Sequence, residues 1–87
     1  MIGKTIRHMR ESSKMSQIDL ANELGIGQTT LSGYERGYSK PNYEIIERIA
    51  EICDFNIYFN DKNSNELYDK DGNLLKELEI IKKKKDK

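Results

Sequence analysis

The apolar residues of the first half of the chain recur every three or four positions, as on one face of a helix. The first stripe predicts an amphipathic helix that ends near Ser12, and its apolar members are Ile2, Ile6 and Met9. A second helix is predicted from Ser16, a favourable N-cap with Asp19 three residues later, to Gly25, which tolerates left-handed backbone geometry. Its buried stripe consists of Leu20, Ala21 and Leu24.

Two further helices are predicted between residues 28 and 54. The third extends from about Gln28 to Arg36, with Gly37 as its terminator and Pro41 preventing any continuation. The fourth follows Asn42, an expected N-cap, and extends to about Asp54. Its apolar residues cover more than one stripe, which requires packing partners on two sides. These residues are Ile45, Ile46, Ile49, Ala50, Ile52 and Cys53.

After Asp54 the apolar period changes from helical to alternating. Residues 55–60 alternate as Phe-Asn-Ile-Tyr-Phe-Asn, which predicts a strand with one buried face. Residues 61–65 are turn-like, residues 66–69 can pair back, and Asp71-Gly72 is a second turn signal. Residues 74–81 fit a strand or a short helix, and residues 82–87 form a charged, solvated end.

Composition restricts the class of protein. A chain of 87 residues fits one small domain, and its formal net charge of zero argues against indiscriminate attraction to polyanions. Cys53 is the only cysteine, so the chain can form no internal disulfide and no Cys/His metal site, which suits a reducing compartment. We find no leader pattern and no apolar run of membrane-spanning length, and therefore expect a cytoplasmic protein.

The stretch from Ser16 to Gly37 predicts two helices joined by a short glycine-containing turn, an arrangement whose second helix can enter the DNA major groove. A step of 100° per residue places the buried candidates Leu31, Tyr34 and Glu35 on one side of the helix predicted over residues 28–36. The opposite face contains Gln28, Thr29, Ser32, Gly33 and Arg36. Short uncharged hydrogen-bonding groups suit base edges, whereas carboxylates there would repel phosphate. Each polar residue taken alone is more simply explained as a solvated surface, and only their joint placement favours DNA.

The spacing SQ-x-x-LA-x-x-LGI-x-Q-x-x-L-x-x-YERG-x-x-x-P closely resembles the phage repressor and Cro type of helix-turn-helix protein, the XRE-like family of bacterial regulators. The resemblance covers about residues 2–54. It implies a mainly α fold, a compact bundle of four or five helices, that binds operator DNA as a homodimer on an inverted repeat. We therefore expect a helix-turn-helix domain at 1–54, an extension at 55–81 formed by a strand or hairpin, and a charged tail at 82–87.

Positions matched to the family suggest individual roles. The expected base contacts are Gln28, Thr29, Ser32 and Gly33. The expected phosphate contacts are Ser16, Gln17, Lys14, Arg36 and Lys40. Gly33 departs from the polar residue usual there, so specificity is expected to rest on Gln28 and Thr29. Arg10 and Glu35 resemble a structural ion pair between the first and third helices; by helical phase alone they are two opposite charges that both face inward.

The extension is expected either to cover the fourth helix or to form a dimer interface. We favour the dimer interface, because an exposed strand edge can pair across a two-fold axis. The candidate interface residues are Ile45, Ile52, Phe55, Ile57 and Phe59. An alternative is an antitoxin-like or phage-accessory regulator whose extension binds another protein.

No cofactor, metal or catalytic role is expected. His8 is interpreted as a surface residue and Cys53 as a small buried one, since neither has a partner that would make it a base or nucleophile. The acidic residues of the fourth helix, with Arg48 four positions after Glu44, are interpreted as a solvated face directed away from DNA. Asp69 to Gly72 fits a hairpin turn better than a calcium loop, because leucines would fall at the first and last ligand positions.

Overall fold

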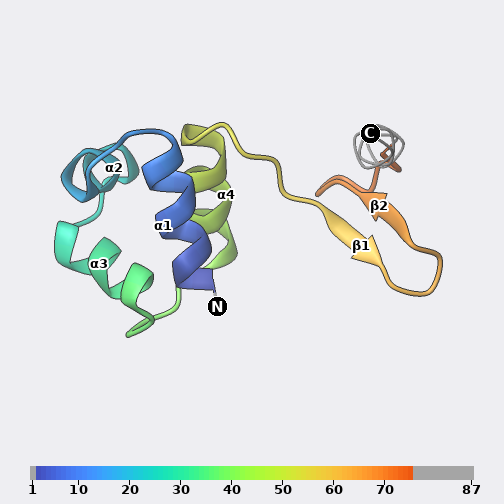
Figure 1. The fold of residues 1–87 in the computed structure, drawn as a ribbon, viewed down its shortest axis with the longest axis horizontal. Helices are drawn as coiled ribbons and strands as arrows, with labels where there is room; N and C mark the ends of the chain where they lie inside the picture. Colours follow the sequence, from blue (N-terminus) through green and yellow to red (C-terminus); the bar gives the residue numbers. More distant parts are fainter. Residues whose placement is uncertain (1, 76–87) are drawn as a thin grey trace, which may run out of the picture. The chain divides into compact units, whose positions relative to one another are not determined.

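A computed structural model describes residues 2–75 of the chain (Figure 1). Its internal contacts divide the chain into two units, Met1–Asn56 and Ile57–Lys87. The described part of the first unit contains the helices α1 (Ile2–Ser12), α2 (Gln17–Leu24), α3 (Gln28–Arg36) and α4 (Tyr43–Ile52). The described part of the second contains the strands β1 (Phe59–Asp61) and β2 (Glu66–Tyr68). The mainly α fold with a small C-terminal hairpin confirms the expected fold class.

All but one of the helix ends described here form where the local sequence predicted them. The Ser16 hydroxyl accepts a hydrogen bond from the Asp19 amide at 3.0 Å, and the Asn42 side chain accepts one from the Ile45 amide at 2.9 Å. Gly25 and Gly37 end α2 and α3 in the left-handed region, at φ of 72° and 82°. Helix α4 ends at Ile52, before the expected Asp54, because Asp54 itself has a left-handed φ of 62°.

The core of the first unit takes one fully buried large side chain from each helix. These residues are Ile6, Leu20, Leu31 and Ile49. Met9, Ala21, Leu24, Ala50 and Cys53 fill the space around them. Helix α1 contacts both α3 and α4 and lies between them (Figure 1). The expectation that α4 packs over a wide arc is only partly met, because Ile45, Ile46 and Ile52 remain half-buried.

Helices α1 and α3 approach each other closely at Gly3, which is buried against the α3 backbone. A Cβ atom built on Gly3 would lie 2.5 Å from the Tyr34 carbonyl oxygen and 2.6 Å from that of Glu35. Both atoms belong to backbone and cannot move independently of their helix. The absence of a side chain at position 3 therefore sets the distance between α1 and α3.

The second unit is an antiparallel hairpin in which Phe59 is opposite Tyr68 and Asp61 is opposite Glu66. Asp61 organises the turn, since its carboxylate accepts a hydrogen bond from the Asn63 amide at 2.9 Å. The predicted turn and return strand are thus confirmed. Leu74 forms an isolated bridge to Tyr68, and the remainder of the segment expected at 74–81, apart from Leu75, lies outside the described residues, as does the tail at 82–87.

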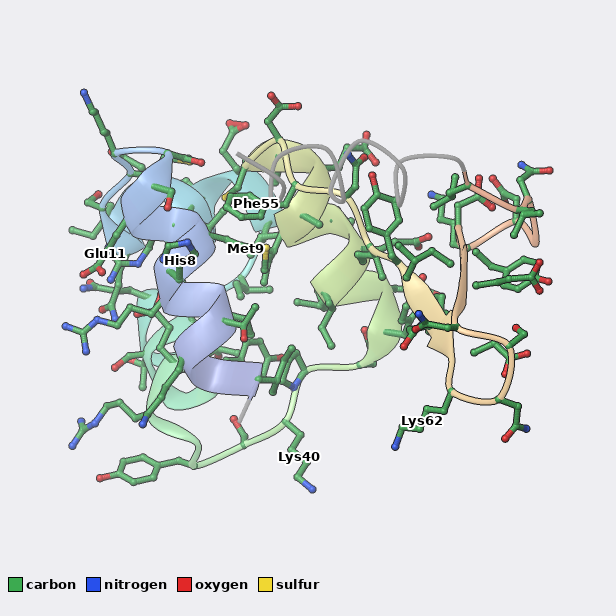
Figure 2. The ribbon with its side chains drawn as sticks, turned by 45° about the vertical axis from the view of Figure 1, so that its right-hand side comes forward. His8, Met9, Glu11, Lys40, Phe55 and Lys62 are labelled. Atoms are coloured by element: carbon green, nitrogen blue, oxygen red, sulfur yellow. The ribbon has the colours of Figure 1, made fainter. Side chains whose placement is uncertain are left out.

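The strand predicted over residues 55–60 was wrong in its start and in its burial. It begins at Phe59, because the Phe55 amide still donates to the Ala50 carbonyl of α4 at 2.7 Å. The Phe55 ring lies edge-on to His8 of α1, with centroids 6.0 Å apart (Figure 2). Phe59 is 51% exposed, and no residue from 57 to 75 is buried. The alternation of apolar residues therefore predicted one half-buried strand where the structure has a contact at the end of α4, followed by an exposed hairpin.

Among the residues that the structure describes, no helix has the length and apolar character needed to cross a bilayer.

The close contact at Gly3 predicts that a glycine-to-alanine substitution, which usually stabilises a helix, destabilises this one. Gly3→Ala should lower the free energy of unfolding by about 1–3 kcal/mol, because the new methyl group pushes on two backbone carbonyls. Ordinarily alanine is favoured over glycine in a helix by about 1 kcal/mol. Gly33→Ala is the matched control, since its Cβ would meet only the Ser39 hydroxyl at 3.2 Å, and an exposed serine can rotate. Urea denaturation of both variants measures the difference; equal stability of the two would contradict the packing argument.

Candidate nucleic-acid interface

A tight turn connects α2 to α3. The Ile26 amide donates to the Ala21 carbonyl at 3.0 Å, which closes the C-terminus of α2 around the left-handed Gly25. Gly27 is the N-cap of α3 and contributes no side-chain hydrogen bond there. The two helices therefore follow each other within three residues, as the sequence predicted.

One side of α3 is packed and the other is open. Leu31 is fully buried and Glu35 is 7% exposed, whereas Tyr34 is half-buried. The face of α3 predicted to contact DNA bases is called the reading face below. Its exposed residues are Gln28, Thr29 and Arg36, and its half-buried residues are Ser32 and Gly33. This face contains no carboxylate, so it offers amide, hydroxyl and methyl groups to a ligand.

A charged network attaches α3 to the rest of the bundle. Arg10 of α1 donates through Nε to Glu35 Oε2 at 2.7 Å and through Nη2 to Oε1 at 3.0 Å, a bidentate pair. A third donor, Arg10 Nη1, reaches the Met15 carbonyl at 3.0 Å. The side chains are only 11% and 3% exposed. The pair thus joins α1, α3 and the segment before α2 at one point.

Glu35 stays charged in this position. Burial by itself raises its pKa, but the hydrogen bonds from Arg10 and Gln17 and the positive charge of Arg10 outweigh burial and lower the pKa below its ordinary value. The same hydrogen bond raises the pKa of Arg10, against the effect of its own burial. Both groups are therefore ionised across the physiological range.

Gln17, an expected phosphate contact, is partly committed to this network. Its Nε2 donates to Glu35 Oε1 at 3.1 Å, and the side chain is half-buried at the start of α2. A side-chain amide has two N–H groups, so one remains for another acceptor. Ser16 likewise uses its oxygen as the N-cap of α2, while its hydroxyl hydrogen remains. Lys14 is exposed, with a left-handed φ of 58°.

The end of α3 carries the remaining expected phosphate contacts. Lys40 is exposed in the segment between α3 and α4 (Figure 2). Arg36 donates through Nη2 to the Tyr38 hydroxyl at 2.9 Å, and its Cζ lies 4.7 Å from the centre of the Tyr38 ring. Tyr38 was not among the residues predicted for this surface. Its signal was an aromatic residue placed beyond a helix terminator, where no core stripe requires one.

Arg48 has a different role from the one predicted. Its guanidinium donates to the carbonyls of Leu24 at 3.0 Å and Glu23 at 3.1 Å, and so caps the C-terminus of α2. Helix α2 has no basic residue in its own last turn, which was the available signal.

The candidate dimer residues fall in different units. Ile45, Ile52 and Phe55 are half-buried in the first unit, and Phe55 contacts His8 there. Ile57 and Phe59 belong to the second unit, with Phe59 exposed.

No group of three or more potential metal ligands occurs among residues 2–75. His8 is exposed, with its ring nitrogen 3.4 Å from the Ser12 hydroxyl, and Cys53 is buried.

Comparison with known proteins gives consistent matches. A family model described as helix-turn-helix matches residues 6–59. Antitoxin PezA of Streptococcus pneumoniae is 33% identical over 97% of this chain and 54% of its own length. The cryptic phage CTXphi transcriptional repressor RstR of Vibrio cholerae is 33% identical over 60% of this chain and 47% of its own. The chain thus spans about half the length of each of these two relatives.

The transcriptional regulator SinR of Bacillus licheniformis is 29% identical over 93% of this chain and 73% of its own length. No solved structure gives a significant match.

The buried pair predicts a reversal of pH dependence. In the unchanged chain Glu35 has a lowered pKa, so its stabilising contribution is complete above the ordinary pKa of glutamate and is lost as the pH falls through the lowered value. Arg10→Met should cost about 3–5 kcal/mol at neutral pH, because a buried carboxylate loses its partner. Burial then raises the pKa of Glu35, and the variant should lose stability as the pH rises above the ordinary value.

Urea denaturation between about pH 3 and pH 7 measures both curves, with about 4.3 as the reference pKa of glutamate. Arg7→Met is the matched control, since Arg7 pairs with Glu11 on the same helix at 63% side-chain exposure and its charge is the weakest of the influences that lower the pKa of Glu35. It should follow the unchanged chain within about 1 kcal/mol. Parallel pH curves for Arg10→Met and Arg7→Met would contradict the assigned network.

Proposed function

The chain belongs to the helix-turn-helix family, of the repressor and Cro (XRE-like) type, and on this premise we propose that it is a sequence-specific DNA-binding transcriptional regulator. Its action is that of a repressor that occupies an operator as a homodimer on an inverted repeat. The relatives RstR and SinR, named as a repressor and a transcriptional regulator, support this proposal. Catalysis, metal and cofactor have no part in it, and its site of action is the cytoplasm.

The observation that carries the proposal is the two-sided character of α3. Leu31 and Glu35 anchor the buried inner side, whereas Gln28 and Thr29 are exposed on the outer side. Gln28 can donate to and accept from adenine, and the Thr29 methyl group can contact a thymine methyl. A helix held in this way presents a fixed pattern of donors, acceptors and methyl groups to the major groove.

Phosphate contacts around α3 give the protein its register on the duplex. We assign Gln17 and Ser16 at the start of α2, Lys40 after α3 and Arg36 at its end to the sugar-phosphate backbone, with Lys14 as an additional contact. The positive end of the α2 dipole lies beside Ser16 and Gln17 and favours an anion there. Ser32 and Gly33, half-buried, complete the base-facing surface.

Dimerisation is assigned to the C-terminal extension together with Ile45, Ile52 and Phe55. A two-stranded hairpin is marginally stable alone, and no residue from 57 to 75 is buried. Within the described residues β1 pairs only with β2, so its outer edge is open to a second copy. Ile57 and Phe59 supply the apolar surface for this pairing.

A second candidate function is an antitoxin-like regulator whose extension binds a different protein. The match to PezA, named as an antitoxin, covers 97% of the chain and so extends beyond residue 59, where the family model ends. In this case the hairpin is completed by the protein partner.

Enrichment of duplexes from a random DNA pool tests the main proposal. We expect a palindromic motif, which would report both specificity and two-fold symmetry. Recovery of no motif at low salt would contradict sequence-specific binding.

Base and phosphate contacts should respond differently to truncation. Gln28→Ala should reduce discrimination at one base pair by about 1–3 kcal/mol. Lys40→Ala should weaken binding to enriched and scrambled duplexes alike and lower the salt slope by about 1. Asn22→Ala, which removes an exposed amide from α2, should change neither quantity. Fluorescence anisotropy at several salt concentrations measures these effects, and full retention of base preference by Gln28→Ala would show that the reading face is assigned wrongly.

The dimer proposal is tested by sedimentation. Phe59→Lys should shift the chain toward monomer, because it places a charge on the open edge of β1, whereas Lys62→Ala in the adjacent turn should leave association unchanged (Figure 2). If the unchanged chain stays monomeric at high concentration, both free and on DNA, the homodimer is wrong and the second candidate gains support.

A further inference from the structure

Tyr38 is the most exposed large hydrophobic residue of the described chain, at 75%. It contributes nothing to the core, yet its ring and hydroxyl both contact Arg36. Arg36 is the last residue of α3. A contact between two exposed side chains calls for an explanation other than burial of apolar surface.

The backbone places Tyr38 against the end of the helix. Gly37 takes a left-handed φ of 82°, and the Tyr38 amide then donates to the Gly33 carbonyl at 2.9 Å. The chain therefore folds back on the last turn of α3. This geometry brings a residue two positions beyond Arg36 beside its guanidinium.

The pair keeps unused hydrogen-bond donors. A guanidinium has five N–H groups, and the hydroxyl of Tyr38 accepts only one of them, from Nη2. The Tyr38 oxygen is the acceptor, so its own hydrogen remains available. No carboxylate among the described residues neutralises Arg36. The pair is therefore a positively charged cluster of N–H and O–H donors without an acceptor of opposite charge.

The pair of Arg36 and Tyr38 lies where a residue that contacts DNA is expected. By helical phase Arg36 shares the face of Gln28 and Ser32, and Lys40 follows four residues later. A cation at the C-terminus of a helix also stabilises that helix. That role gains nothing from an aromatic partner, whereas binding to one phosphate is favoured when a partner already restricts the long, flexible side chain.

We propose that Tyr38 is a positioning residue that holds Arg36 against one DNA phosphate at the end of the recognition helix. This inference rests on the proposed DNA-binding function. The ring restricts the guanidinium to one orientation through a cation–π contact, and the hydroxyl fixes Nη2. The free N–H groups then meet the phosphate oxygens with little further loss of side-chain entropy.

A double-mutant cycle on the full chain tests the proposal. The variants are Arg36→Ala, Tyr38→Ala and both together, and the probes are a duplex enriched from a random pool and a scrambled duplex of equal length. Arg36→Ala should weaken binding to both duplexes by about tenfold and lower the salt slope by about 1. Tyr38→Ala should weaken both by about two- to fivefold. The double variant should bind no worse than Arg36→Ala, because Tyr38 acts through Arg36.

Two controls separate this result from general damage. Tyr43→Ala, which removes an exposed tyrosine from the start of α4, should leave affinity unchanged. The Arg36 and Tyr38 variants should each remain folded under the conditions of the binding assay, with a cooperative urea transition of unchanged slope. In the free protein, the δ-methylene protons of Arg36 should show a ring-current shift in the NMR spectrum that is lost in Tyr38→Ala.

Additive losses in the double variant, an unchanged affinity for Tyr38→Ala, or absence of the ring-current shift would overturn the positioning role. If Arg36→Ala has no effect while Gln28→Ala alters base preference, this inference fails and the proposed function stands. If neither variant changes binding to any duplex, the proposed function itself fails.

Discussion

The ion pair between Arg10 and Glu35 is the interaction on which the presentation of α3 depends. It lies at the junction of α1, α2 and α3, and Gln17 and the Met15 carbonyl complete its hydrogen bonds. Two charges at this depth are costly to remove from water, so their benefit is in geometry more than in net stability. No buried side-chain polar atom of the described residues lacks a partner, which is the condition for such a network to persist. The ion pair and the close backbone contact at Gly3 together fix the distance and the orientation of α3 relative to α1.

Much of the fold could be predicted because the signals are local. Ser16 and Asn42 each accept a hydrogen bond three residues away, and Gly25 and Gly37 take the left-handed geometry that ends a helix. The region after α4 could not be predicted as well. Phe55 has the spacing of a strand residue, but its ring meets His8, 47 positions earlier in the chain. The alternation of apolar and polar residues is a local pattern, so it could not predict a contact with a residue so distant in the chain.

In the candidate interface too, the features set by local sequence could be predicted and those set by tertiary contacts could not. The open face of α3 follows from helical phase alone, so its members were identifiable from the sequence. The roles of Gly3, Arg48 and Tyr38 could not be predicted, because each depends on a contact made only after folding. Arg48 meets Glu23 and Leu24 across two helices, and Tyr38 reaches Arg36 only because Gly37 reverses the chain. Sequence patterns identify faces, whereas the partners across those faces come from tertiary structure.

The outer residues of α3 are decoupled from the packing that anchors it. Gln28 and Thr29 are exposed, while every residue that fixes the helix lies on its inner side. Exchanges at these two positions leave the core intact, since exposed substitutions rarely alter stability by more than about 0.5 kcal/mol. Under the proposed function, a lineage carrying this scaffold can therefore change its target sequence through substitutions at a few surface positions, while the architecture is inherited unchanged.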